Sequence, residues 1–128
     1  EIFESLLKYM YENLEGFGEY LALDGKAVKS YATNYSKKIE EDGRRDTDAN
    51  WGTKKYTEST NAKGEKVTNK LPWFGYRIHL IVDTEYELPV AYKITQASKS
   101  ENAEAKKILK AMHEEQLERC KYLMADKG

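Results

Sequence analysis

Two short apolar runs of strand length each end at an aspartate, and this pair constrains the fold more than any other feature of the chain. Residues 20–23 are followed by Asp24 and Gly25, and residues 120–125 are followed by Asp126. A continuous apolar run is typical of a strand buried on both faces at the centre of a sheet. Ligand sites in open α/β sheets gather at the carboxyl ends of strands. We therefore expect both acids at the rim of one sheet, each directly after its strand.

Helical and strand patterns alternate along the rest of the chain. Apolar spacing predicts a leading helix over residues 1–18, ended by glycines. Residues 73–82 predict a strand with Phe74, Tyr76, Ile78, Leu80 and Val82 on one face. A short turn leads to a second strand over residues 88–95, so we expect an antiparallel hairpin.

A second helix is predicted to follow that hairpin. Ser98 and Glu101 have capping-box spacing, which indicates a helix start at this point. Its buried stripe is predicted to contain Ala105, Ile108, Leu109 and Met112. Because the last strand returns through this helical crossover, it should lie parallel to its neighbour in a mixed sheet.

Residues 25–70 are predicted to form an irregular insertion between the first and second strands, with a short hairpin around residues 61–64. The insertion carries eleven basic and seven acidic side chains, a net charge of +4. A basic segment can follow a phosphate backbone, although a solvated loop explains the same charge. The candidate DNA-binding residues are Lys26, Lys37, Lys38, Arg44, Arg45, Lys54 and Lys55.

Length and composition exclude several classes of protein. A chain of 128 residues fits one domain or part of one, and its net charge of −1 does not describe a strongly basic nucleic-acid-binding domain. Cys120 is the single cysteine, which excludes an intramolecular disulfide and a multi-cysteine zinc site. The longest apolar stretches are far short of the ~20 residues that span a bilayer. We therefore expect a cytoplasmic chain with no membrane partner.

Carboxylates at the ends of neighbouring strands are suited to hard divalent cations. Mg²⁺ prefers oxygen ligands and is commonly held by one or two carboxylates together with waters and substrate phosphates. Two such ions can activate the attacking oxygen and stabilise the leaving oxygen of a phosphoryl displacement. Asp24 and Asp126 are therefore candidate metal ligands, although an aspartate that only caps the turn after its strand explains the same pattern.

Four segments in order carry a resemblance to a known family. They are residues 21–26 (LALDGK), 46–55 (DTDANWGTKK), 74–80 (FGYRIHL) and 124–128 (MADKG). In this order they resemble the catalytic domain of the DDE transposases of bacterial insertion sequences, over nearly all of the chain after Gly18. The resemblance implies that residues 1–128 are a partial RNase H-like catalytic domain, a mixed α/β sheet with flanking helices truncated after its fourth strand.

The resemblance also implies a chemistry and assigns roles to the two acids. Asp24 would be the first catalytic acid and Asp126 the second, binding two Mg²⁺ or Mn²⁺ ions for cleavage of DNA and strand transfer. The third acid of the family is a glutamate on a later helix, which residues 1–128 do not contain, so we expect the fragment alone to be inactive. Transposon-end and target DNA are the implied partners, and a homodimer is the implied assembly.

Two rival functions remain open on the sequence. One is an RNase H-like nuclease or resolvase that cuts DNA without strand transfer. The other is a non-catalytic nucleic-acid-binding module, in which the acids only cap turns.

Other residues that could carry chemistry are less well supported. Asp46, Asp48 and Asn50 begin like a calcium loop but lack its Gly and Glu, and His79 is more simply structural. Cys120 is expected to be a small buried hydrophobe. The insertion also holds aromatic residues that either stack on bases or form a local cluster, namely Tyr31, Tyr35, Trp51 and Tyr56.

Overall fold

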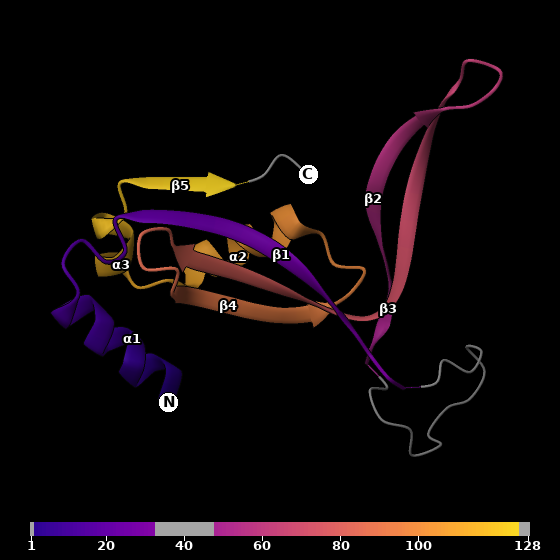
Figure 1. Cartoon of the computed structure of the whole chain (residues 1–128). Helices are drawn as coiled ribbons and strands as arrows, with labels where there is room; N and C mark the ends of the chain where they lie inside the picture. Colours follow the sequence, from indigo (N-terminus) through magenta and orange to yellow (C-terminus); the bar gives the residue numbers. More distant parts are fainter. Residues whose placement is uncertain (1, 33–47, 126–128) are drawn as a thin grey trace. The chain divides into compact units, whose positions relative to one another are not determined.

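The structure is a computed structural model that describes residues 2–32 and 48–125, with the backbone alone for residues 55–57. In chain order the elements are α1 (Ile2–Asn13), β1 (Tyr20–Lys29), β2 (Asn50–Thr60), β3 (Lys66–Asp83), β4 (Pro89–Gln96), α2 (Glu101–Ala111), α3 (Glu114–Arg119) and β5 (Tyr122–Ala125) (Figure 1). They divide into two compact units. The first comprises residues 1–26, 78–93 and 100–128, and the second residues 27–77 and 94–99.

The strands form one five-stranded mixed sheet. Its order is β2-β3-β1-β5, and β4 also pairs with β3. β5 lies parallel to β1, as expected for a strand that returns through a helical crossover, whereas β3 runs opposite to both β1 and β4 (Figure 1). The predicted RNase H-like mixed sheet with flanking helices is therefore confirmed.

The core of the first unit lies between its helices and its strands. Residues from α1, β1, β3, β4 and α2 meet there, and the buried ones are Leu7, Phe17, Leu21, Ile81, Val90, Ile108 and Met112. The predicted stripe of α2 is confirmed, because Ala105, Ile108 and Met112 are buried and Leu109 packs against the same core. Among the described residues, no helix is both long and apolar enough to cross a membrane.

The first strand is longer than predicted. The sequence predicts an end at Asp24 and Gly25, but β1 continues to Lys29. The prediction was wrong because the polar residues after Leu23 were interpreted as the end of the strand. In the structure, backbone hydrogen bonding extends the strand through these polar residues. Directly after β1, the Ser30 N–H donates to the carbonyl oxygen of Phe74 in β3 at 2.9 Å.

The predicted irregular insertion is mostly wrong for residues 50–70. A hairpin does turn at residues 61–64, but its strands pair from Asn50↔Gly75 to Thr60↔Lys66, with a bulge between Lys55 and Thr57. β3 accordingly begins at Lys66, seven residues before the predicted start. The strands escaped detection because they carry Lys, Thr, Glu and Asn in place of the apolar alternation that marks a half-buried strand.

One local prediction also differs from the structure. The N-cap of α2 is Ser100, not Ser98, because Ser98 instead accepts a hydrogen bond from Asn50 Nδ2 at 2.8 Å and donates its N–H to Asn50 Oδ1 at 2.9 Å. On β3, where the sequence predicted two faces without saying which is buried, the more deeply buried face is the one with His79, Ile81 and Asp83.

Candidate metal centre

Asp24 lies inside β1 with its side chain exposed to solvent. Leu21 and Leu23 contact the core, and side chains alternate between the faces of a strand, so Asp24 lies on the opposite face. Its Oδ1 accepts the N–H of Gly25 at 2.8 Å. This bond fixes the carboxylate beside its own backbone, and the exposure of the side chain makes it accessible to a ligand.

Packing explains why a glycine follows Asp24. A β-carbon at Gly25 would lie 2.8 Å from Oε1 of Glu101, in the first turn of α2. Real β-carbons essentially never make a contact this short, so the glycine leaves room for the Glu101 carboxylate beside the strand. A larger side chain at position 25 would therefore first displace the flexible end of the Glu101 side chain.

The start of β5 is fixed on β1 by several interactions. Glu19 receives two backbone N–H groups on its carbonyl oxygen, from Lys121 at 2.7 Å and from Tyr122 at 3.2 Å. The Lys121 ammonium lies 2.8 Å from Glu19 Oε2, and this carboxylate raises the pKa of Lys121. The rings of Tyr20 and Tyr122 are stacked with centroids 5.9 Å apart. These contacts hold β5 in a single register against β1.

That register runs in parallel from Tyr20↔Tyr122 to Leu23↔Ala125. The residue after Leu23 is Asp24, and the residue after Ala125 is Asp126. Asp126 itself lies outside the described residues. Within residues 2–32 and 48–125 no three His, Cys, Asp or Glu side chains gather as a metal site.

The candidate DNA-binding residues are placed only in part. Lys26 is exposed on β1 in the first unit, and Lys54 is exposed on β2 in the second. Lys55 belongs to β2, but its side chain lies outside the description. The remaining four lie outside the described residues, namely Lys37, Lys38, Arg44 and Arg45.

The other sequence candidates have structural contacts. Asp48 accepts the hydroxyl of Tyr76 at 2.7 Å, and His79 is 2% exposed. Cys120 packs against the core, and burial raises the pKa of its thiol. The Trp51 ring lies 5.6 Å from that of Phe74, whereas Tyr31 is fully exposed and belongs to no cluster of described aromatic rings. Tyr35, Asp46 and the Tyr56 side chain lie outside the description.

Sequence reasoning missed two buried carboxylates. Asp83 is fully buried and accepts three N–H groups, from Gly18 at 2.8 Å, Glu85 at 3.0 Å and Tyr86 at 2.8 Å. Its place after a strand and before a turn was visible in the sequence, but its contact with Gly18 joins residues far apart in the chain. Asp83 therefore ties the end of β3 to the loop that leads into β1.

Glu104 is the second of these carboxylates. It is buried on α2, with the Lys93 ammonium 2.7 Å from Oε2 and the Lys107 ammonium 2.7 Å from Oε1. The hydrogen bonds from the two lysines lower the pKa of Glu104 to about 2. The carboxylate is therefore ionised at neutral pH and joins α2 to β4.

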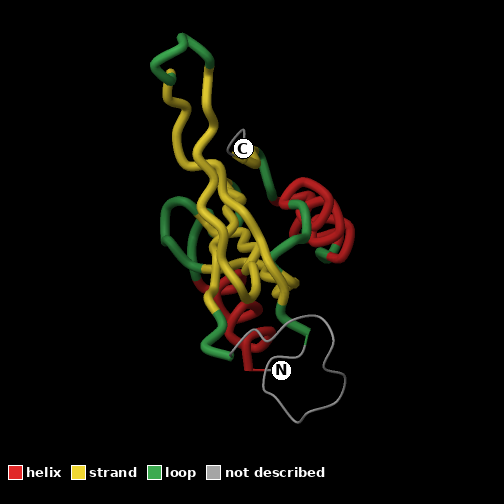
Figure 2. Tube along the Cα trace, turned by 90° about the vertical axis from the view of Figure 1, so that its right-hand side faces the viewer, coloured by secondary structure: helices red, strands yellow, loops and turns green. Residues whose placement is uncertain are grey.

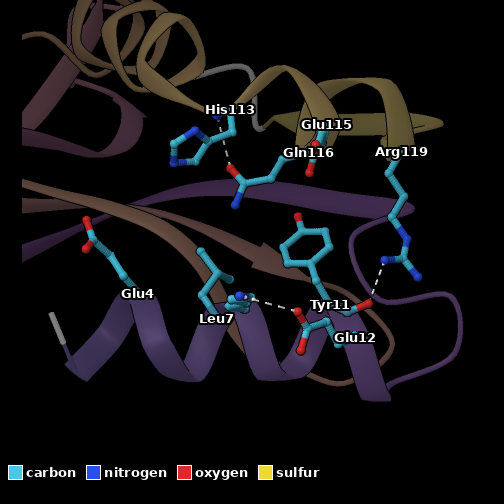
Figure 3. Close-up of a pocket in the computed structure, with 9 residues that line it drawn as sticks. Glu4, Leu7, Tyr11, Glu12, His113, Glu115, Gln116 and Arg119 are labelled. Carbon is cyan, nitrogen blue, oxygen red and sulfur yellow. Dashed lines mark hydrogen bonds and ion pairs between the residues drawn. The ribbon is translucent and has the colours of Figure 1, made fainter.

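A separate cavity of about 710 Å³ lies between α1 and α3 (Figure 3). Tyr11 lines it, and burial raises the pKa of this side chain to about 12, so the phenol stays protonated at neutral pH. Arg119 stacks on the Tyr11 ring at 5.4 Å and donates to its carbonyl oxygen at 2.8 Å. None of the predicted site residues lines this cavity.

Comparison with known proteins gives one result that bears on identity. The family described as "Transposase DDE domain" matches residues 17–128, which leaves out only α1 and the turn after it. No curated protein and no solved structure matches the chain. Since the match covers all five strands and most of the chain, the chain belongs to the DDE transposase domain family.

Proposed function

We propose that Asp24 and Asp126 are catalytic acids that hold divalent metal ions for the cleavage and strand transfer of DNA. The observation that carries the proposal is the parallel pairing of Leu23 with Ala125, one residue before each acid. Neighbouring strands lie about 4.8 Å apart. Continued by one residue, the register gives two carboxylates on the same face of the sheet, close enough to share an ion.

The donor set fits the metal. Asp24 offers an exposed carboxylate in a strand fixed on both sides, by β3 and by β5. Asp24 and Asp126 would hold two Mg²⁺ or Mn²⁺ ions, which when bound would supply activation of the attacking oxygen and stabilisation of the leaving oxygen. The two aspartates orient the site, and a third carboxylate, which the family places on a later helix, completes it.

The protein's own residues have two further tasks in this proposal. Lys26 follows Asp24 by two residues on the same face of β1 and is exposed, so it attracts the phosphate backbone to the acids. The basic residues of the insertion, Lys54 among them, add positive charge that attracts DNA. We propose a bacterial DNA transposase that acts in the cytoplasm on paired DNA ends as a homodimer.

Metal binding by the full 128-residue chain tests the site directly. Titration with Mn²⁺ should show binding that Asp24→Asn and Asp126→Asn each abolish, while Glu118→Gln, an exposed acid on α3, leaves it unchanged. Equal binding by all four proteins would contradict the proposal, because the loss of a ligand must weaken the metal site.

Cleavage by a transposase that contains this chain and a third acid separates the rival functions. Asp24→Asn should abolish metal-dependent cleavage of transposon-end DNA and leave DNA binding intact. Cleavage without joining to target DNA would indicate a nuclease or resolvase. DNA binding with no cleavage by the unsubstituted protein would indicate a binding module.

A further inference from the structure

The outer part of the β2–β3 hairpin, residues 53–71, is a ribbon of two strands with no core on either face. We refer to it as the arm. Every described side chain in it is exposed except Asn61 at the turn. Figure 2 shows the arm as two strands joined by a loop at its end. A hairpin of two strands is only marginally stable by itself in water. Because the arm is long and does not pack against a core, we expect it to bind a partner.

The tip of the arm is ordered by its own hydrogen bonds. Asn61 Oδ1 accepts the N–H groups of Lys63 at 2.9 Å and Glu65 at 3.0 Å. The Asn61 side-chain amide donates to Glu65 Oε2 at 2.8 Å, and Gly64 donates its N–H to the Asn61 carbonyl at 2.9 Å. Gly64 has φ of +80°, a conformation that glycine adopts without strain. The tip therefore has one defined shape.

The base of the arm is anchored by aromatic packing. Trp73 is buried, its indole N–H donates to the carbonyl of Tyr76 at 3.1 Å, and the Arg77 guanidinium lies 5.0 Å from its ring. Opposite residues Trp51 and Phe74 bring their rings within 5.6 Å on the other face. The base of the arm is thus packed, whereas its outer part is held by the pairing of its two strands.

The charge of the arm indicates which class of partner it binds. Residues 53–71 carry five lysines and two glutamates, a net charge of +3 on a chain whose total is −1. Lys66 and Lys70 lie on the same face of β3 as Phe74, because side chains alternate along a strand. Val67 and Leu71 lie on the other face of β3, and both are exposed apolar residues. A basic ribbon with few apolar side chains is complementary to a polyanion, not to an apolar protein surface.

We propose that the arm binds in the major groove of duplex DNA, with Lys66 and Lys70 contacting phosphates. The major groove admits a ribbon of two antiparallel strands, whereas the minor groove is about half as wide. Lysine binds the phosphates of the DNA backbone. This inference rests on the proposed transposase function and adds the element that grips the DNA.

Salt dependence of DNA binding by the full chain tests the role of the two lysines. Each phosphate contact contributes about 0.9 to the slope of log K against log salt, so Lys66→Ala with Lys70→Ala should reduce that slope by about 1.8. The matched control is Lys106→Ala with Lys110→Ala, which removes the same charge from exposed positions on α2 and should retain the slope. Lys66→Arg with Lys70→Arg should also retain it.

The groove is tested with modified DNA. A duplex with glucosylated hydroxymethyl groups at cytosine C5, which faces the major groove, should bind at least tenfold more weakly, and netropsin in the minor groove should have little effect. The proposal is overturned if the slope is the same for the Lys66/Lys70 variant and the unsubstituted chain, if the α2 control changes it equally, or if netropsin alone competes. Mn²⁺ binding at Asp24 is measured without DNA, so failure of the arm and failure of the metal site are distinguishable.

Discussion

Leu23 of β1 and Ala125 of β5 are direct neighbours in a parallel strand pair, although 101 residues lie between them in the chain. The pairing is fixed at the other end of β5, where Lys121 and Tyr122 bond to the carbonyl of Glu19. Because a strand is stiff, a register fixed at its start holds three residues later. In the proposed metal site, we therefore expect the spacing of the two acids to depend on contacts outside the acids themselves.

Loss of the Lys121–Glu19 ion pair should weaken metal binding without unfolding the chain. Lys121→Gln removes the ammonium that lies 2.8 Å from Glu19 Oε2. The expected result is weaker Mn²⁺ binding in a titration, with only a small change in melting temperature because the pair is exposed. Lys110→Gln on α2 is the control for charge. Unchanged Mn²⁺ affinity in Lys121→Gln would show that the backbone contacts alone hold the register.

The same ion pair gives an alkaline pH dependence. The pKa of Lys121 is raised in the folded chain, so the pair stabilises the fold at and below the ordinary pKa of lysine, and this contribution is lost as the pH rises through the raised value. Thermal unfolding between neutral and strongly alkaline pH should show a smaller loss of stability in Lys121→Gln than in the unsubstituted chain. Parallel pH curves for the two proteins would contradict this assignment.

Glu104 should dominate the acid sensitivity of the first unit. Its pKa is lowered to about 2 from an ordinary value of 4.5, so it stabilises the fold above about pH 4.5 and loses this contribution as the pH falls toward 2. Glu104→Gln should lower the melting temperature at pH 7 and flatten its decline between pH 5 and about 2. The control is Glu114→Gln, at an exposed acid of α3. An equally steep decline in Glu104→Gln would exclude this carboxylate as the cause.

Asp83→Ala should be among the most destabilising single substitutions in the first unit. It leaves three N–H groups of the described chain without their acceptor, those of Gly18, Glu85 and Tyr86. Each unsatisfied buried group costs about 1–3 kcal/mol, so we expect a loss of about 3 kcal/mol or more in urea unfolding. Asp83→Asn keeps one side-chain oxygen and should lose less. Equal stability of the two variants would contradict the hydrogen-bond explanation.

Gly75→Ala should disrupt the base of the arm. Gly75 has φ of +148°, and a β-carbon there would collide with the Val28 carbonyl oxygen and approach Ser30 N to 2.6 Å. The strained backbone alone costs about 1–3 kcal/mol. Hydrogen exchange should therefore accelerate at Ser30, whose N–H bonds to Phe74. Gly64→Ala is the control, because its φ of +80° also strains an alanine but no atom lies within 4 Å of a β-carbon there. Equal exchange at Ser30 in both variants would contradict this account.

Apolar periodicity predicted the elements of the first unit well, because their side chains build the core. The stripe of α2, including Ala105 and Ile108, is the clearest case. The arm was missed because Lys66, Thr68 and Lys70 form a strand exposed on both faces, where no apolar alternation is required. The extension of β1 past Asp24 depends on pairing with a distant strand, which local sequence does not encode. Similarly, the three bonds to Asp83 join parts of the chain that only the fold brings together.

The most direct test of the two-acid metal site is a crystal structure of the 128-residue chain soaked with Mn²⁺. We predict an anomalous peak between Asp24 and Asp126, with one carboxylate oxygen of each within about 2.2 Å of the ion, close to the distance that Mg²⁺ requires. The same soak of Asp24→Asn should lack the peak. A refined Asp126 whose carboxylate lies away from Asp24, on the other face or at another edge of the sheet, would contradict the two-acid site that this register predicts.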